Sequence, residues 1–179
     1  MSNNINRKEK IALAALHLFA ERGYENTTTS LIANTAGVSE ALIFKHFGNK
    51  ENLLNYVVKS GYNRIITHNR GMVKETDPLK LIFKVIDLPK KLILDEPEFW
   101  KLQTRLMDIE PYEIQYQLFL HPVYTLLTKA FTDLEYINPE KETELILLMV
   151  EGMWKSYVAK KDEQTLQLAA FIKTKYGKQ

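Results

Sequence analysis

The stretch TTSLIANTAGVSEALIFKHF, residues 28–47, decides the fold class of this chain. It predicts two short helices, residues 29–36 and 39–47, joined by a turn that contains Gly37. Ala33 is small where the two helices must cross closely, and Val38 can fill the angle between them. This pattern is typical of a helix-turn-helix, in which the second helix enters the major groove of DNA.

The second helix of this motif has two faces. Ile43 and Phe47 are four positions apart and therefore share one face, which we expect to pack inward. The other face then presents Glu40, Ala41, Phe44 and Lys45 to solvent or to DNA. Leu42 either reaches a base edge or is half-buried, and packing is the favoured interpretation.

The flanking sequence predicts a helix on each side of the motif. Apolar residues at helical spacing indicate a helix over residues 6–22 that ends at Gly23, because glycine adopts a left-handed backbone without penalty. Residues 24–27 predict a loop, after which Thr28 can cap the next helix with its hydroxyl. Gly48 and Asn49 interrupt the chain again, and a long helix is expected from Lys50 to about residue 69.

The remainder of the chain also favours helices. Asp77-Pro78, Glu96-Pro97 and Asn138-Pro139 each place a capping residue before a proline at the first helical position. They predict helices from residue 78, over 98–109 and over 139–160, while Asp162 can cap a last helix over 163–176. Pro111 and Pro122 are expected to mark further breaks. The prediction is an all-α chain of eight or nine helices, with a DNA-binding domain at 1–49 and a helical regulatory and dimerisation domain at 50–179 that begins with the long helix.

Composition excludes several classes of protein. Apolar residues make up 45% and charged residues 26% of the chain, as in an ordinary globular protein. Because there is no cysteine, disulfides, thiolate metal sites and cysteine nucleophiles are excluded. No apolar stretch has the length of a signal peptide or a membrane span, so we expect a soluble, cytoplasmic protein without membrane contact.

A set of residues at fixed spacing covers residues 7–55: Ile11, Ala15, Phe19, Gly23, Tyr24, Thr28, Ile32-Ala33, Ala36-Gly37-Val38-Ser39, Phe44-Lys45-His46-Phe47, Lys50-Glu51 and Leu53-Leu54. By these residues, this part of the chain resembles the DNA-binding domain of the TetR family of bacterial transcriptional regulators. The resemblance implies an all-α homodimer that binds a palindromic operator, most often as a repressor, and a C-terminal domain that binds an unknown small-molecule effector. Phe44 departs from the family, which usually has tyrosine there, and it lacks the hydroxyl that would contact a phosphate.

Candidate DNA contacts follow from the motif and the resemblance. Thr28 is chiefly a cap, whereas Thr29 and Ser30 lie at a helix N-terminus, where amides favour phosphate. Lys45 and Ala41 are the expected base readers, and the resemblance places Lys50 on a phosphate. Glu40 either accepts from cytosine or repels wrong sites, and His46 either binds a phosphate or is simply packed. Ser39, which precedes the reading helix, completes the set.

No constellation of residues supports an enzyme or a cofactor. The sequence contains no glycine-rich phosphate loop, no Gly-x-Ser-x-Gly elbow and no His-Glu-x-x-His pair. His17 and Glu21 are one helical turn apart, but two ligands are weak support for a metal site. The remaining alternative is a helical interaction protein that merely retains the motif.

The C-terminal region contains candidates for a ligand pocket and for a dimer interface. Aromatic and polar residues that suit a mostly apolar pocket, or equally the packing of a core, are Trp100, Gln103, Thr104, Met107, Tyr116, Tyr124 and Trp154. We expect the last two helices to pair with their symmetry mates as a four-helix bundle, because they have more apolar surface than one small domain can bury. The expected interface residues are Leu145, Leu148, Met149, Gly152, Leu166, Ala169, Ala170 and Lys173.

Overall fold

The structure, a computed structural model, describes residues 6–160 and 164–177, and within them it is all-α, without a strand. The helices are α1 (Arg7–Arg22), α2 (Thr29–Ala36), α3 (Glu40–Phe47), α4 (Lys50–His68), α5 (Arg70–Val73), α6 (Pro78–Asp95), α7 (Pro97–Leu106), α8 (Tyr112–Asp133), α9 (Pro139–Lys160) and α10 (Gln164–Tyr176). The all-α prediction is confirmed. The number of helices was predicted one or two too low, because α5 is a four-residue turn of helix with no periodic pattern.

Most helix starts lie where the capping residues predict them. The Thr28 hydroxyl accepts the amide N–H of Leu31, and the Asp77 carboxylate accepts that of Lys80. Ser39 occupies the N-cap position of α3, but its side chain makes no capping hydrogen bond. Glu96 precedes Pro97 as expected and also does not cap, because both its oxygens accept from the Arg64 guanidinium at 2.6 and 2.8 Å.

Two expected boundaries were wrong and one lies outside the described residues. Pro122 does not break the chain, since α8 continues through it. The carbonyl of Leu118, which loses its partner there, lies on a solvent-facing turn, since Leu118 is 69% exposed and water can replace the missing N–H. The helix after Glu96 ends at Leu106 rather than at Ile109. The cap expected at Asp162 falls on a residue that the structure does not describe.

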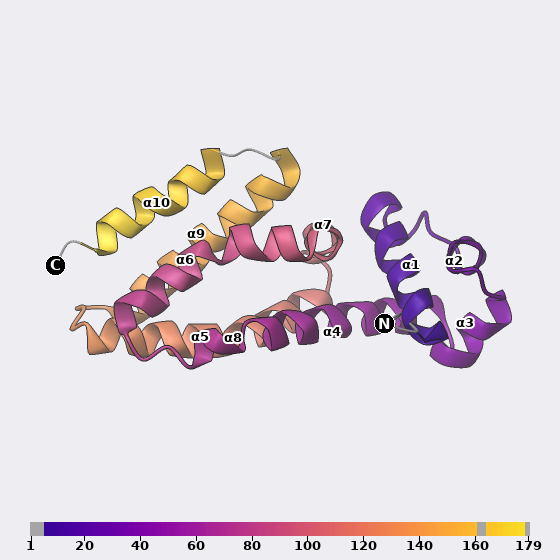
Figure 1. Ribbon diagram of the computed structural model, residues 1–179, viewed down its shortest axis with the longest axis horizontal. Coiled ribbons are helices and arrows are strands. Elements are labelled where there is room, and N and C mark those ends of the chain that lie inside the picture. Colours follow the sequence, from indigo (N-terminus) through magenta and orange to yellow (C-terminus); the bar gives the residue numbers. More distant parts are fainter. Residues whose placement is uncertain (1–5, 161–163, 178–179) are drawn as a thin grey trace, which may run out of the picture.

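The DNA-binding motif lies at one end of an elongated molecule. Figure 1 shows α1, α2 and α3 gathered at that end, and α4 leading away from them along the lower side, near α8. Helices α6, α8 and α9 pack against one another in the C-terminal region, and α10 packs on α6 and α9. Of the helices described, none has the length and apolar character that crossing a bilayer requires.

The buried apolar residues form two clusters. The first joins the DNA-binding end to the C-terminal region, because it contains Ile11 and Ile43 as well as Trp100, Tyr116 and Trp154. The second lies among α6, α8, α9 and α10. The boundary expected between residues 49 and 50 therefore runs through a continuous core rather than between two cores.

Helices α4 and α7 approach each other closely at Gly61. A Cβ added to Gly61 would lie 2.0 Å from Cε2 of Phe99, whose ring is fully buried. The ring also packs edge-on against Tyr62, at 5.3 Å between centroids. The ring of Phe99 thus rests directly on the backbone of α4.

Candidate nucleic-acid interface and ligand cavity

The turn between α2 and α3 has the geometry that the sequence predicts. Gly37 is left-handed, with φ 65° and ψ 40°, a conformation that glycine adopts without strain. The amide of Val38 donates to the Ala33 carbonyl at 3.0 Å, and Ala33 is buried where α2 packs. These contacts fix the angle at which α3 leaves the motif.

Helix α3 presents one face to the core and one to solvent. Ile43 and Phe47 are buried, and Leu42 is half-buried against the same cluster, as predicted. The side chains on the other face are exposed: Ala41, Phe44, Lys45 and His46. Phe44 leaves 47% of its surface in water, which is a large apolar exposure on the face of α3 that points away from the core.

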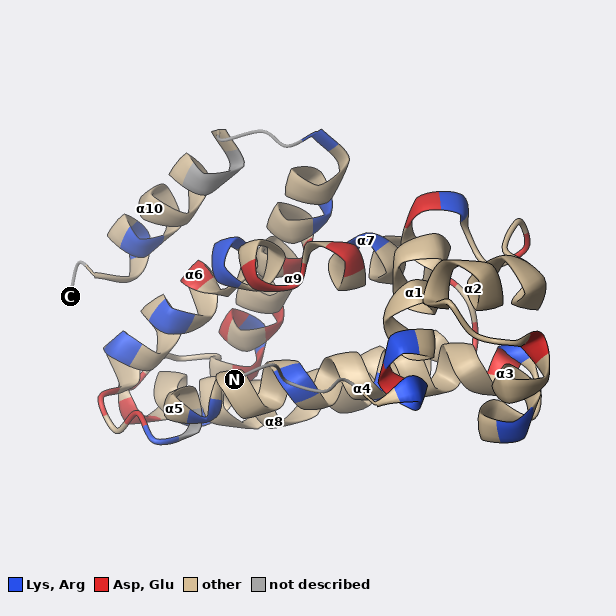
Figure 2. Cartoon of the chain, turned by 45° about the vertical axis from the view of Figure 1, so that its right-hand side comes forward, with Lys and Arg blue, Asp and Glu red and all other residues tan. Residues whose placement is uncertain are grey.

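The start of α3 is tied to the start of α2. The hydroxyl of Thr29 donates to Oε1 of Glu40, so each side chain already has a partner. Ser30 and Ser39 are exposed nearby. In Figure 2, α2 is entirely tan while α3 has both an acidic and a basic position, so charge at the motif is concentrated on the reading helix.

Lys50 is anchored beside the motif. Its Nζ donates to the Tyr24 carbonyl at 2.9 Å and lies 4.0 Å from the centre of the Tyr24 ring. An ammonium has three protons, so this anchoring leaves donors for a further acceptor. Burial, followed by the charge of Glu51, raises the pKa of the Tyr24 hydroxyl.

Helix α7 is bonded to α1 by polar side chains. Glu98 accepts from or shares a proton with His17 at 2.6 Å, and Lys101 donates to Glu21 at 2.8 Å. The Arg105 guanidinium donates to the carbonyl of Ala20 at 3.2 Å. The hydrogen bond from Lys101 holds the pKa of the Glu21 carboxyl below its ordinary value. His17 and Glu21 therefore have separate partners on α7, and among the described residues no group of three or more His, Asp or Glu could hold a metal.

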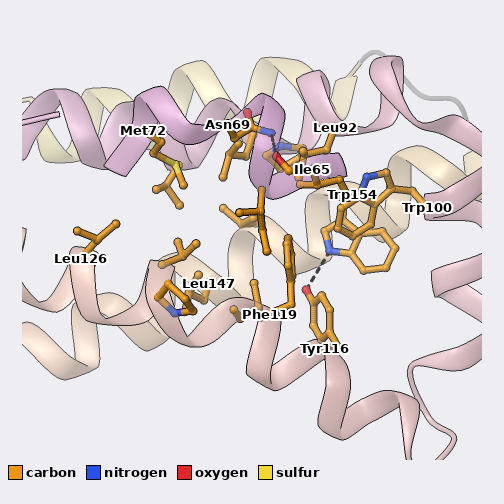
Figure 3. Close-up of a pocket in the computed structure, with 18 residues that line it drawn as sticks. Ile65, Asn69, Met72, Leu92, Trp100, Tyr116, Phe119, Leu126, Leu147 and Trp154 are labelled. Atoms are coloured by element: carbon orange, nitrogen blue, oxygen red, sulfur yellow. Dashed lines mark hydrogen bonds between the residues drawn. The ribbon is translucent and has the colours of Figure 1, made fainter. Parts of the chain in front are cut away.

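An apolar cavity of about 140 Å³ lies among α4, α6, α7, α8 and α9. All of its lining residues are uncharged. Figure 3 labels ten of them: Ile65, Asn69, Met72, Leu92, Trp100, Tyr116, Phe119, Leu126, Leu147 and Trp154. Ile66 and Pro122 also line it and are exposed, which places an opening between α4 and α8.

The few polar atoms at the cavity are incompletely paired. The indole nitrogen of Trp154 donates to the Tyr116 hydroxyl over 3.4 Å, the contact drawn in Figure 3. The indole nitrogen of Trp100 is buried with no acceptor. Burial raises the pKa of the Tyr116 hydroxyl, so this group stays neutral. The cavity thus offers almost wholly apolar walls, and the unpaired Trp100 nitrogen is enclosed in the protein rather than exposed to the cavity.

Three of the seven residues expected to bind a ligand line this cavity: Trp100, Tyr116 and Trp154. The other four lie elsewhere. Gln103 accepts from the Tyr62 hydroxyl at 2.7 Å, Thr104 donates to the carbonyl of Lys101, and Met107 is buried in the first cluster. Tyr124 lines a shallow groove between α8 and α9.

The walls contributed by α4 and α6, and the α8 wall apart from Tyr116, were not identified from the sequence. Ile65, Leu88 and Phe119 are apolar residues on amphipathic helices, and nothing in their spacing separates a cavity wall from a filled core. The one usable signal was Asn69, a polar residue at the end of the long helix beside apolar neighbours.

The residues expected at the dimer interface fall into two groups. On α9, Leu145 and Leu148 are 46% and 70% exposed, Gly152 is exposed and Met149 is half-buried. On α10, Lys173 pairs with Asp87 of α6 at 2.7 Å, Ala169 packs on the second cluster and Ala170 is exposed. The side chain of Leu166 lies outside those described. Helix α8 adds Ile114 and Leu118 beside the α9 groove, 49% and 69% exposed.

Residues 11–57 match the family described as bacterial regulatory proteins, tetR family. The transcriptional repressor AcnR of Corynebacterium efficiens is 29% identical over 104 residues, which cover 53% of this chain and 55% of that protein. AcnR of Corynebacterium diphtheriae is 45% identical over 70 residues, 38% of this chain and 37% of the relative. The chain therefore spans about half or less of the length of these relatives.

Solved structures share the fold over nearly the whole chain. A TetR transcription regulator from Haloarcula marismortui superposes with a TM-score of 0.79 at 19% identity, covering 95% of both chains. The regulator FadR from Bacillus subtilis, solved in complex with stearoyl-CoA, has a TM-score of 0.74 at 19% identity and covers 93% of this chain and 96% of its own. The match of the C-terminal helices is thus one of architecture.

Proposed function

Because residues 11–57 belong to the tetR family of bacterial regulatory proteins, we propose that this chain is a DNA-binding transcriptional regulator rather than an enzyme. It acts as a ligand-responsive repressor that binds a palindromic operator as a homodimer, in the cytoplasm where the DNA is. The observation that carries the proposal is the exposed face of α3, held out by a core face of Ile43 and Phe47. Relatives named as a repressor and as a negative regulator support repression rather than activation.

In this proposal α3 lies in the major groove. Lys45 donates to guanine acceptors and Ala41 contacts a thymine methyl, because these are the pairings that base edges permit. Phe44 packs its ring on the backbone or on a methyl group, and His46 lies toward a phosphate. Lys50 uses a remaining proton on a phosphate while its stem stays against the Tyr24 ring.

The neighbouring side chains position the reading helix. Thr28 caps α2, which turns its amides toward the backbone of the DNA, and Ser30 and Ser39 offer hydroxyls there. Thr29 can donate to a phosphate only by releasing Glu40. Since Glu40 is engaged by Thr29, its role is to fix α3 against α2 and to place a negative charge that disfavours phosphate on that side.

Dimerisation is proposed through α8 and α9. Their exposed apolar residues are Ile114, Leu118, Leu145 and Leu148, and pairing this face with its symmetry mate would bury them in a four-helix bundle. Gly152 allows close approach on the same helix. For α10, the ion pair of Lys173 with Asp87 supports packing within the chain instead.

The effector site is proposed at the apolar cavity. Its walls are almost wholly apolar and therefore suit a small apolar group. Stearoyl-CoA in the FadR neighbour supports a small-molecule effector in this architecture.

Helix α7 is the proposed route from the effector to DNA, together with α4. Trp100 lines the cavity, while Lys101 and Arg105 of the same helix hold α1. A ligand that displaces Trp100 moves α7 against α1, and it lowers operator affinity only if it binds the displaced conformation more tightly.

The test begins with DNA selected by the purified chain from a random duplex pool. The selected sites should be palindromic, with half-site centres about 34–36 Å apart or a multiple of that distance. Affinity should fall steeply with salt in an anisotropy titration, because phosphate contacts release counterions. Failure to enrich any sequence would refute the regulator and favour a helical protein that keeps the motif for another purpose.

A further inference from the structure

A charged groove adjoins the apolar cavity. The two hollows share Asn69, Met72 and Leu88, but the groove is also lined by His68, Lys84, Asp87 and Lys91. Charge is therefore absent from the cavity and present immediately beside it. A molecule that occupied both would need one apolar end and one polar end.

Lys91 is the cation of this groove that has no carboxylate partner. Lys84 is paired with Glu75 at 2.5 Å, and the Asp87 carboxylate is paired with Lys173 at 2.7 Å. Lys91 donates only to the amide oxygen of Asn69, at 2.9 Å, and no carboxylate of the described residues lies within ion-pair distance of its Nζ. His68 supplies a second nitrogen donor on the groove wall. The groove thus retains one uncompensated positive charge.

Asn69 lies where the two hollows meet. Its amide oxygen accepts from Lys91 and its NH₂ donates to the Ile65 carbonyl at 2.8 Å, the second contact drawn in Figure 3. An anion at this point can take over the Lys91 proton from a neutral amide oxygen, and a charged acceptor makes the stronger hydrogen bond.

We propose that the effector is an anionic amphiphile whose short apolar tail fills the cavity and whose carboxylate or phosphate lies in the groove against Lys91. This inference rests on the proposed function, in which the cavity is the effector site. A cavity of about 140 Å³ is close to the ~150 Å³ engineered cavity that holds benzene, so the buried tail is a short alkyl chain or one ring. A cationic head group would be repelled by Lys91, and an uncharged one would accept only a weaker hydrogen bond from it.

The chain carries its own probe for this site. It has two tryptophans, Trp100 and Trp154, and both line the cavity with their rings 4.9 Å apart. Intrinsic fluorescence therefore reports occupancy of the cavity. Octanoate, 1-octanol and octylamine share one tail length and differ in head group, which makes them suitable titrants.

The matched variants are Lys91→Gln and Lys90→Gln. They remove the same charge from adjacent positions of α6, but Lys90 lines the hollow toward α10 instead of this groove. Wild type should bind octanoate at least about threefold more tightly than octanol, in a salt-sensitive manner, and octylamine least. Lys91→Gln should abolish the preference for octanoate, and Lys90→Gln should preserve it.

Three results would overturn the inference. These are octanol binding as tightly as octanoate, the two variants behaving alike, or no fluorescence change with any of the three molecules. Anisotropy titrations of the same preparations with selected DNA keep this failure separate from that of the proposed function. If the protein still binds operator while giving any of those results, the proposal of an anionic effector is refuted and the proposal of a DNA-binding regulator is not.

Discussion

Replacing Gly61 with alanine tests the close contact between α4 and α7. The new Cβ would lie 2.0 Å from Phe99 Cε2, whereas ordinary contact begins at 3.4 Å. The ring cannot simply swing away, because it is fully buried and packs edge-on against Tyr62 and Trp100. In an open helix, replacing glycine with alanine stabilises the folded state by about 1 kcal/mol. Overpacking a core destabilises it by about 1–3 kcal/mol, and by more when the neighbouring side chain is enclosed.

We therefore expect Gly61→Ala to lower the free energy of unfolding by about 1–2 kcal/mol and the melting temperature by a few degrees. The assay is urea unfolding followed by circular dichroism, at one protein concentration because dimerisation would add to stability. Gly71→Ala is the matched control, since its Cβ meets nothing within 4 Å, and it should be neutral or stabilising.

A double-mutant cycle identifies the cause. Phe99→Leu removes ring atoms that the new methyl would meet, so the loss caused by Gly61→Ala should shrink in that background. Equal stability of Gly61→Ala and wild type, or a loss that Phe99→Leu leaves unchanged, would refute the reasoning.

Four further substitutions have defined outcomes. In anisotropy titrations, Lys50→Ala should weaken binding to operator and random DNA about equally, whereas Lys45→Ala should also relax base preference. If Lys45→Ala also weakens binding to operator and random DNA equally, Lys45 does not contact bases. Gly152→Ala has open space within one chain, so it should weaken only the dimer in sedimentation, and an unchanged dimer would place the interface elsewhere. The Lys80 amide holds the pKa of the Asp77 carboxyl below its ordinary 3.8, so the stability that it supplies is present above that value and is lost as pH falls through the lowered pKa. Asp77→Asn keeps an uncharged cap and should therefore lose less stability than wild type in acid unfolding, and identical acid profiles would contradict this.

The helix-turn-helix was predictable from sequence because its constraints are local. Gly37 for a left-handed turn, Thr28 for a cap and the four-residue spacing of Ile43 and Phe47 all act within a few positions. The proline rule worked at Pro78, where a missing amide costs nothing. It failed at Pro122. The cost of a proline inside a helix depends on whether solvent reaches the carbonyl four residues earlier, and that exposure cannot be read from the sequence.

The cavity and its partners were less predictable because they depend on side chains far apart in the chain. Trp100 and Trp154 could be chosen as candidates by residue type, but whether aromatic residues fill a core or leave a hollow is decided by how the helices around them cross. Likewise Lys50 was identified as a candidate for phosphate, yet its bond to the Tyr24 carbonyl joins positions 26 residues apart. The links between α7 and α1 join residues 80 and 81 positions apart, and no sequence pattern signals them.

The hydrophobic cluster that runs from α1 to Trp154 has a genetic consequence. Residues joined in one cluster tend to open together in native-state hydrogen exchange, so the amides of α1 and α7 should exchange with similar protection. A substitution in the aromatic wall then destabilises the DNA-binding helices with no effector present. Alleles that abolish the proposed repression should consequently scatter through this core, and only a minority should map to the exposed face of α3.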